Sequence, residues 1–475
     1  MPKHRSKWRV STLEVSVTLL LALAGVGLEK PSVVPRFIVS WQLWSHGVLS
    51  RLDRRVPRAE RTVVVEVDDD TFWTKLGGTQ PTNRHFLGEV IQAAAGGNAA
   101  VIALDFQLKS PTDQWGDSPE RGADNAYLER AIHQATSRHI PVVLTTGLIP
   151  LQGQSKAGFG FEKQWRREPN IFDDRALVCP SSIWKPDSCA NPSLRRGPKA
   201  EDDSRQPGNS EIGRDAGVSV GFINLPTDKR MIPLSWNVQE FDQNQEKSNL
   251  ELSSFALQIV NAYEDADNIT PRTETNPRIQ AAINQDQFVY AGFLKPGAFE
   301  RPDESAPGEG DSTVSLSAQN VIQNEQTRYL LNHRIVIIGA TWHVFGSGRG
   351  PAVDAYPTPV GLIPGVYLHA NYVESLLDQR FAGPLPVYAA LLVDLGFGYL
   401  LLVVMHWAEG NAWRLIVMFA CVLIPVLAAY ILMVNLGRYL DFVIPMLLLF
   451  LHIPIDRLEK IREHRGSKEP CEDAH

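Results

Sequence analysis

Motifs that mark the common catalytic chemistries are scarce in this sequence. It has no His-Glu-x-x-His metalloprotease motif, no protein-kinase signature, and no Cys-x-x-Cys pair among its four cysteines. A nucleophile elbow is not expected either. The sequence therefore predicts no enzyme, and we assign neither a catalytic residue nor a cofactor from it.

An excess of basic residues is also lacking. The chain of 475 residues has a formal net charge of -7 at pH 7. Residues 1–10 carry four basic side chains, so the central part of the chain is more acidic than the total suggests. Proteins that bind nucleic acid normally present a basic face. This balance argues against a nucleic-acid partner and leaves the chemistry of any other ligand open.

Long apolar runs are present, but only near the two ends of the chain. Residues 10–28 follow the basic stretch 1–9, and this pattern fits either a membrane-spanning signal anchor or a cleaved signal peptide. Three further runs, 387–405, 415–434 and 440–455, are near the length that crosses a bilayer. We predict four transmembrane helices in contact with the lipid bilayer.

Basic residues at both ends indicate the orientation. Positive charge stays on the cytoplasmic side, so we expect residues 1–9 and the tail 456–475 to be cytoplasmic. An even number of spans then places residues 30–386 outside. The predicted location is the bacterial inner membrane, with one large extracytoplasmic domain.

The central region alternates strand and helix patterns, which favours an α/β domain with a mainly parallel sheet. The predicted strands are 62–67, 99–108, 140–148, 218–225, 288–294 and 334–339. The predicted helices are 84–95, 124–137, 250–263, 318–331 and 364–379. Between 150 and 217 the pattern gives way to Gly, Pro, Ser and mixed charge, which indicates a long insertion.

Acidic residues fall at or near the predicted strand ends: Asp68, Asp69, Asp105 and Asp354. Ligands bind beyond the carboxyl ends of strands in open parallel sheets, so these four and His369 are candidate ligand-binding residues. Alternatively, the carboxylates cap helices and hold loops in place. A metal site of His343, His369 and Asp354 would have irregular spacing, and no metal is predicted.

Two of the four cysteines, Cys179 and Cys189, fall in the region predicted to be exported. An oxidising environment favours a disulfide between them. Two free thiols in a flexible insertion are the alternative.

Five segments carry the most informative pattern, in the order 63–69, 100–106, 221–224, 335–340 and 354–370. Together with the three trailing spans, they resemble the second class of CHASE domains, the cyclase- and histidine-kinase-associated sensory extracellular domains of bacterial receptors. Two departures stand out. The usual Trp residues are missing around Leu76 and Gly77, and Asp228-Lys229 replaces an expected Asp-Gly.

The resemblance implies a membrane sensor that binds an unknown small extracytoplasmic ligand. Family members normally continue into a cytoplasmic output domain, whereas about 20 residues follow Ile455 here, too few for a domain. We therefore expect signalling through a separate cytoplasmic partner or a homodimer. The alternatives are a membrane-anchored extracytoplasmic hydrolase and a structural subunit of a membrane complex.

Overall fold

The computed structural model describes residues 36–52, 59, 61–78, 82–108, 119–150, 165–167, 217–226, 228–241, 247–266, 276–277, 279–280, 288–294, 315–346, 348 and 350–386, and parts of 388–440. The chain divides into two compact units. One comprises Arg54–Gly383, and the other combines Met1–Asp53 with Pro384–His475.

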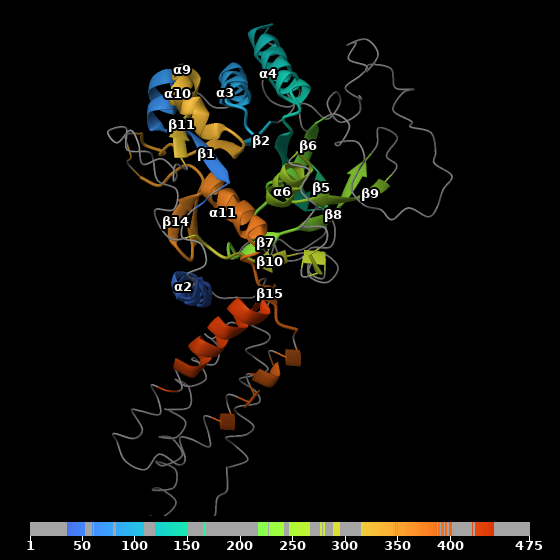
Figure 1. The fold of residues 1–475 in the computed structure, drawn as a ribbon, viewed down its shortest axis with the longest axis vertical. Helices are drawn as coiled ribbons and strands as arrows, with labels where there is room; N and C mark the ends of the chain where they lie inside the picture. The colour runs from blue at the N-terminus through green and yellow to red at the C-terminus, as the bar shows by residue number, and fades with distance from the viewer. Residues whose placement is uncertain are drawn as a thin grey trace, which may run out of the picture. The chain divides into compact units, whose positions relative to one another are not determined.

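The unit Arg54–Gly383 is built on a six-stranded parallel sheet (Figure 1). Its spatial order is β11-β1-β12-β2-β3-β6. The strands are β1 (Thr62–Val67), β2 (Val101–Gln107), β3 (Val142–Thr146), β6 (Val218–Phe222), β11 (Ser315–Ser317) and β12 (Ile335–Ala340). The late strand β12 lies between β1 and β2, so the centre of the sheet is completed only when the end of the unit folds.

Helices cover both faces of this sheet. The first face packs against α3 (Arg84–Gly96), α4 (Pro119–Ser137) and α9 (Ala318–Gln323). The second packs against α6 (Phe255–Ala266) and α11 (Gly365–Leu377) (Figure 1). Val63 and Val65 point into the first core and Val64 into the second, as the period of two in a strand requires. A strand buried on both faces reads as a continuous apolar run, which explains why β1, β2, β3 and β12 were predicted.

Smaller sheets complete the unit. A four-stranded sheet has the order β4-β5-β8-β9, and two pairs are formed by β7 with β10 and by β13 with β14. Their bounds are β4 (Leu148–Pro150), β5 (Trp165–Arg167), β7 (Met231–Pro233), β8 (Ser235–Phe241), β9 (Lys247–Ser253), β10 (Phe288–Tyr290), β13 (Ala355–Thr358) and β14 (Gly361–Pro364). The remaining short elements are η1 (Asp70–Lys75), α10 (Glu325–Arg328), η5 (Tyr329–Leu331) and β15 (Gly383–Pro384).

The structure corrects several expected elements. The helix expected over 250–263 begins only at Phe255, because Lys247–Ser253 pairs with β8 as a strand. The strand expected over 288–294 shortens to β10, which pairs antiparallel with β7 outside the main sheet. The helix expected over 318–331 divides at Asn324, whose extended backbone ends α9 and whose side chain caps α10. Strand β11 was not predicted.

In the second unit, the structure describes α2 (Arg36–Leu52), η6 (Leu432–Leu436) and β16 (Arg438–Tyr439). Within the described residues, no helix has both the length and the apolar character needed to cross a membrane. The expected span 10–28 lies outside the described residues, as does 440–455 apart from Leu440. The spans expected over 387–405 and 415–434 are described only in pieces.

Candidate functional site

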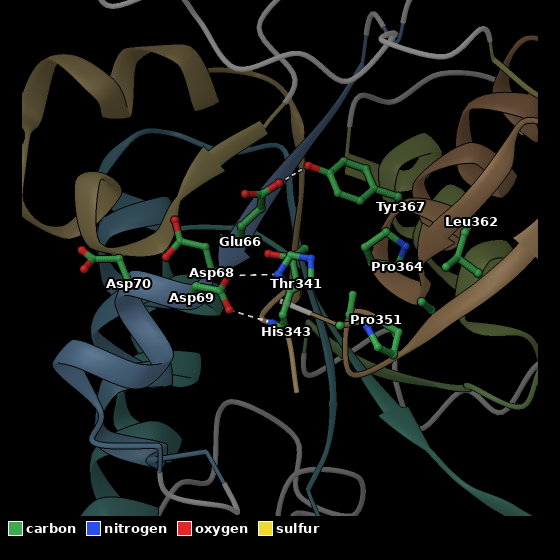
Figure 2. A pocket seen from close by; sticks show the side chains of 13 residues that line it. Glu66, Asp68, Asp69, Asp70, Thr341, His343, Pro351, Leu362, Pro364 and Tyr367 are labelled. Atoms are coloured by element: carbon green, nitrogen blue, oxygen red, sulfur yellow. Dashed lines mark hydrogen bonds and ion pairs between the residues drawn. The ribbon is translucent and has the colours of Figure 1, made fainter. Parts of the chain in front are cut away.

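A pocket of about 560 Å³ opens at the carboxyl ends of β1 and β12 (Figure 2). Ligands of α/β proteins commonly bind at this edge of the sheet. The chain segments after the two strands, the hairpin β13–β14 and the first turn of α11 form its walls. Its lining is Glu66, Asp68, Asp69, Asp70, Thr341, His343, Gly350, Pro351, Ala352, Ala355, Leu362, Pro364 and Tyr367. Four of these side chains are carboxylates, so the pocket favours positive charge.

Asp69 fixes the loop that follows β12. Its carboxylate accepts hydrogen bonds from the backbone N–H of His343 at 2.7 Å and of Gly348 at 2.8 Å. Nδ1 of His343 lies 2.9 Å from the same carboxylate (Figure 2). Burial acts to raise the pKa of Asp69, but the bonds from His343 and Gly348 outweigh it and hold that pKa below its ordinary value. Asp69 is therefore an ionised carboxylate that holds one wall of the pocket.

Two further acidic side chains are engaged within the pocket wall. Asp68 accepts the backbone N–H of Thr71 at 3.0 Å and so stabilises the start of η1. Glu66, only 5% exposed, accepts a hydrogen bond from the hydroxyl of Tyr367 (Figure 2). Sequence reasoning missed both Glu66 and Tyr367 as site residues. The available signal was a single acidic residue within the apolar strand Thr62–Val67.

Asp105 and Asp354 form a second acidic group that does not line the pocket. Asp105 sits at the irregularity in the pairing of β2 with β3, is 9% exposed, and receives no hydrogen bond from the described residues. Burial, reinforced by the nearby charge of Asp354, raises the pKa of Asp105 to about 8. Asp105 is consequently protonated at neutral pH, while Asp354 hydrogen-bonds to the hydroxyl of Tyr356.

Lys229 provides the positive charge of this second group. Burial lowers the pKa of Lys229 to about 8, although Asp354 and Asp228 act to raise it. Nζ of Lys229 donates to the carbonyl of Pro226 at 2.7 Å and lies 4.6 Å from the ring centroid of Tyr356. Lys229 and Tyr356 therefore meet beside Asp354 in a buried polar cluster.

His369 lies deep in the second core instead of in the pocket. Its ring makes edge contacts with Phe255, at 5.2 Å between centroids, and with Tyr372, at 6.2 Å. Burial, together with the charge of Lys229, lowers the pKa of His369 to about 3. The imidazole is therefore neutral and packs as an apolar group. His369 does not line the pocket.

The structure separates the residues once considered for a metal. His343 pairs with Asp69, whereas His369 packs against the rings of Phe255 and Tyr372. Within the ranges that the structure describes, no three His, Cys, Asp or Glu side chains converge as a metal ion would require. Cys179 and Cys189, the predicted disulfide, lie outside the described residues.

Two glycine patterns have structural explanations. Gly346, Gly348 and Gly350 adopt positive φ angles, and the N–H of Gly348 binds the Asp69 carboxylate where a phosphate loop would bind phosphate. Residues 217–221 spell Gly-Val-Ser-Val-Gly, the letters of a nucleophile elbow. Ser219 lies within β6, paired with Val143, and not at the strand-to-helix turn that an elbow requires.

Comparison with known proteins identifies a family for the chain. Among curated proteins and solved structures, none matches the chain. The model of the CHASE2 domain matches residues 17–405, well over half of the chain. CHASE2 domains are extracellular sensory domains. The fold, the pocket at the sheet edge and this match lead to one conclusion: the chain belongs to the CHASE2 domain family.

Proposed function

We propose that this protein is a membrane-held extracytoplasmic sensor whose pocket binds a small organic cation, and that it signals through a separate cytoplasmic partner. The sensory character of the family supports the role. The apolar runs near both ends of the sequence support attachment to a membrane. One observation carries the ligand class, namely the four carboxylates that line a single pocket of about 560 Å³.

The chemistry of the lining favours an organic cation over a metal ion. Asp69 already accepts from three donors and Glu66 accepts from Tyr367. Among the described residues, no three possible metal ligands converge. The side chains of Tyr367, Leu362 and Pro364 line the same pocket and offer apolar contact beside the negative charge. An ammonium or guanidinium group carrying a short apolar chain matches both features.

Thermal unfolding of the full-length protein tests this proposal. The panel contains putrescine, choline and arginine as cations, with acetate and inorganic phosphate as anions. A ligand at 100 times its dissociation constant stabilises the folded state by about 2.7 kcal/mol. We expect stabilisation by at least one cation and by neither anion. Stabilisation by the anions alone would contradict the proposed ligand class, and turnover of any compound would contradict a purely sensory role.

A matched pair of variants locates the site. Glu66→Gln removes one negative charge from the pocket and retains an oxygen that accepts the Tyr367 hydroxyl. It should weaken cation binding roughly tenfold, equivalent to about 1.4 kcal/mol. Glu325→Gln removes an exposed carboxylate in α10 and should leave binding unchanged. Equal affinities in both variants would place the cation elsewhere.

A further inference from the structure

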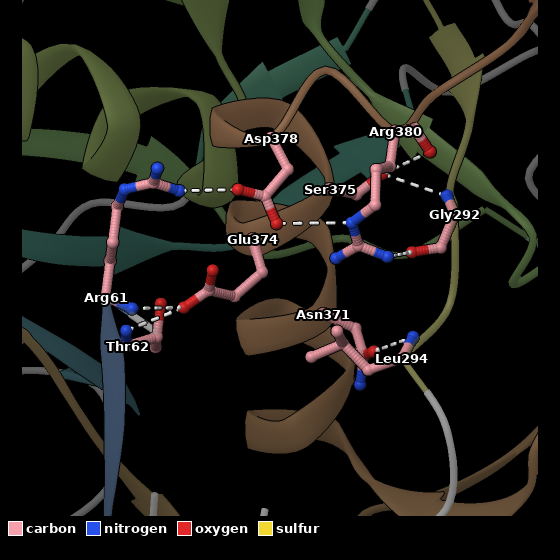
Figure 3. A network of polar contacts seen from close by, with 9 residues as sticks. All are labelled: Arg61, Thr62, Gly292, Leu294, Asn371, Glu374, Ser375, Asp378 and Arg380. Atoms are coloured by element: carbon pink, nitrogen blue, oxygen red, sulfur yellow. Dashed lines mark hydrogen bonds and ion pairs between the residues drawn. The ribbon is translucent and has the colours of Figure 1, made fainter. Parts of the chain in front are cut away.

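We infer that α11 is the mechanical link between the pocket and the two points where the chain enters and leaves the unit Arg54–Gly383. This inference rests on the proposed function only in taking the pocket as the ligand site. One end of α11 contacts the pocket through Tyr367. The other end holds Arg61 and Arg380, which lie inside the unit near its two boundaries, in a polar network (Figure 3).

The entering strand is bound by two acidic side chains of α11. Oε1 of Glu374 accepts the backbone N–H groups of Arg61 at 2.9 Å and of Thr62 at 2.7 Å. The guanidinium of Arg61 donates to Asp378, immediately after the helix, at 2.6 Å (Figure 3). The first residues of β1 therefore follow any movement of the last turns of α11.

The leaving chain is bound to the same turns. Nε of Arg380 donates to Asp378 at 3.2 Å, and its carbonyl accepts the hydroxyl of Ser375 at 3.1 Å. Ser375 in turn accepts the N–H of Gly292, while Asn371 accepts the N–H of Leu294 (Figure 3). Four backbone amides outside the helix thus donate to α11 side chains. A shift of the helix should therefore change the hydrogen exchange of each amide.

The helix between these ends is suited to move as one body. Every residue of Gly365–Leu377 except Tyr367 is buried. Tyr367 and Glu374 are seven residues apart, about 10 Å along a helix axis. A closely packed helix cannot compress, so a shift at the Tyr367 hydroxyl is passed to Glu374 and Asp378.

The network also contains the parts of a second arrangement. Oε2 of Glu374 and Nη2 of Arg380 are buried and have no hydrogen-bond partner within the described part of the chain. Both belong to the same network, in which burial raises the pKa of Glu374 above its ordinary value. A local rearrangement that pairs them would satisfy both groups, so the network holds the polar atoms for a second hydrogen-bonding arrangement.

Hydrogen exchange of the full-length protein, measured by mass spectrometry, tests this link without any ligand. Tyr367→Phe removes one hydroxyl and preserves the ring, so the fold is retained. We expect the amides of residues 61–62 and 292–294 to exchange roughly two- to fivefold faster, as the loss of up to about one net hydrogen bond implies. Leu362→Ala, which trims an exposed pocket side chain on β14, should leave these amides unchanged.

Two outcomes would contradict this link. If Tyr367→Phe alters exchange only at residues 63–70 and 360–370, α11 does not transmit and the inference is wrong. A change of equal size in Leu362→Ala would also overturn it, because that variant does not touch the helix bond. Cation binding is measured separately on the same variants, so failure of the ligand proposal and failure of the link are distinguishable.

Discussion

Asp105 shows how one buried side chain can make this protein sensitive to pH. A carboxyl whose pKa is about 8 in the folded state and near 3.8 when unfolded holds its proton more tightly in the folded protein. The folded state therefore binds more protons than the unfolded chain between about pH 4 and pH 8, and its stability falls as pH rises through that window. Above pH 8 the full penalty for a buried charge is present.

We predict that Asp105→Asn removes this pH dependence. Asparagine resembles the protonated carboxyl in size and cannot ionise. The thermal midpoint of the variant should exceed that of the wild type most clearly above pH 8, with the difference shrinking toward pH 4. Scans of both proteins at matched pH values measure it, and Glu325→Gln serves as the exposed control. A difference that is constant between pH 4 and pH 9 would contradict the assignment.

Gly365 is required by its neighbour and not by its backbone angles. A Cβ added there would collide with Oδ2 of Asp354, which rests against the first turn of α11. We expect Gly365→Ala to lower the free energy of unfolding by about 1–3 kcal/mol, typical of overpacking. Gly96→Ala, at the end of α3 with open space around it, should be neutral or stabilising. Denaturant titration measures the free energy of unfolding of both variants. Equal losses in the two would contradict the predicted collision at Gly365.

Between strand β12 and the hairpin β13–β14, the carboxylate of Asp69 binds two amides of the loop. Asp69→Ala removes the acceptor of the His343 and Gly348 amides, so their hydrogen exchange should accelerate several-fold. Asp68→Ala removes the acceptor of the Thr71 amide at the start of η1, so it should leave exchange at the His343 and Gly348 amides unchanged. If exchange at residues 343–348 is the same in both variants, the loop is held by other contacts.

The central strands were predictable because strands buried on both faces are continuous apolar segments of the sequence. Ile335–Ala340 is a continuous apolar run, and this run alone predicts a buried strand. Its place between β1 and β2 does not, because pairing partners more than 200 residues apart leave no local signal. Residues 250–253 were misread as the start of a helix, since only the pairing of β9 with β8 reveals Leu250 and Leu252 as strand residues.

The candidate site was also predictable only in part. Strand ends drew attention to Asp68 and Asp69, which line the pocket, and to Asp105 and Asp354, whose charges interact outside its lining. Lys229 and Tyr356 could not be foreseen, because the loop and hairpin that carry them reach the cluster only through the tertiary fold. His369 looked polar in sequence and is a packing residue in the second core.

For the chain as a membrane protein, the proposed topology makes a sharp prediction. The insertion around Gly208 belongs to the extracytoplasmic side, whereas Glu463 in the basic tail belongs to the cytoplasm. A reporter enzyme that is active only after export should therefore work when fused at Gly208 and fail when fused after Glu463. A reporter that is active only in the cytoplasm should give the reverse pattern at the same two positions. Export-dependent activity after Glu463 would contradict an even number of spans, and the proposed route from the pocket to a cytoplasmic partner would fail with it.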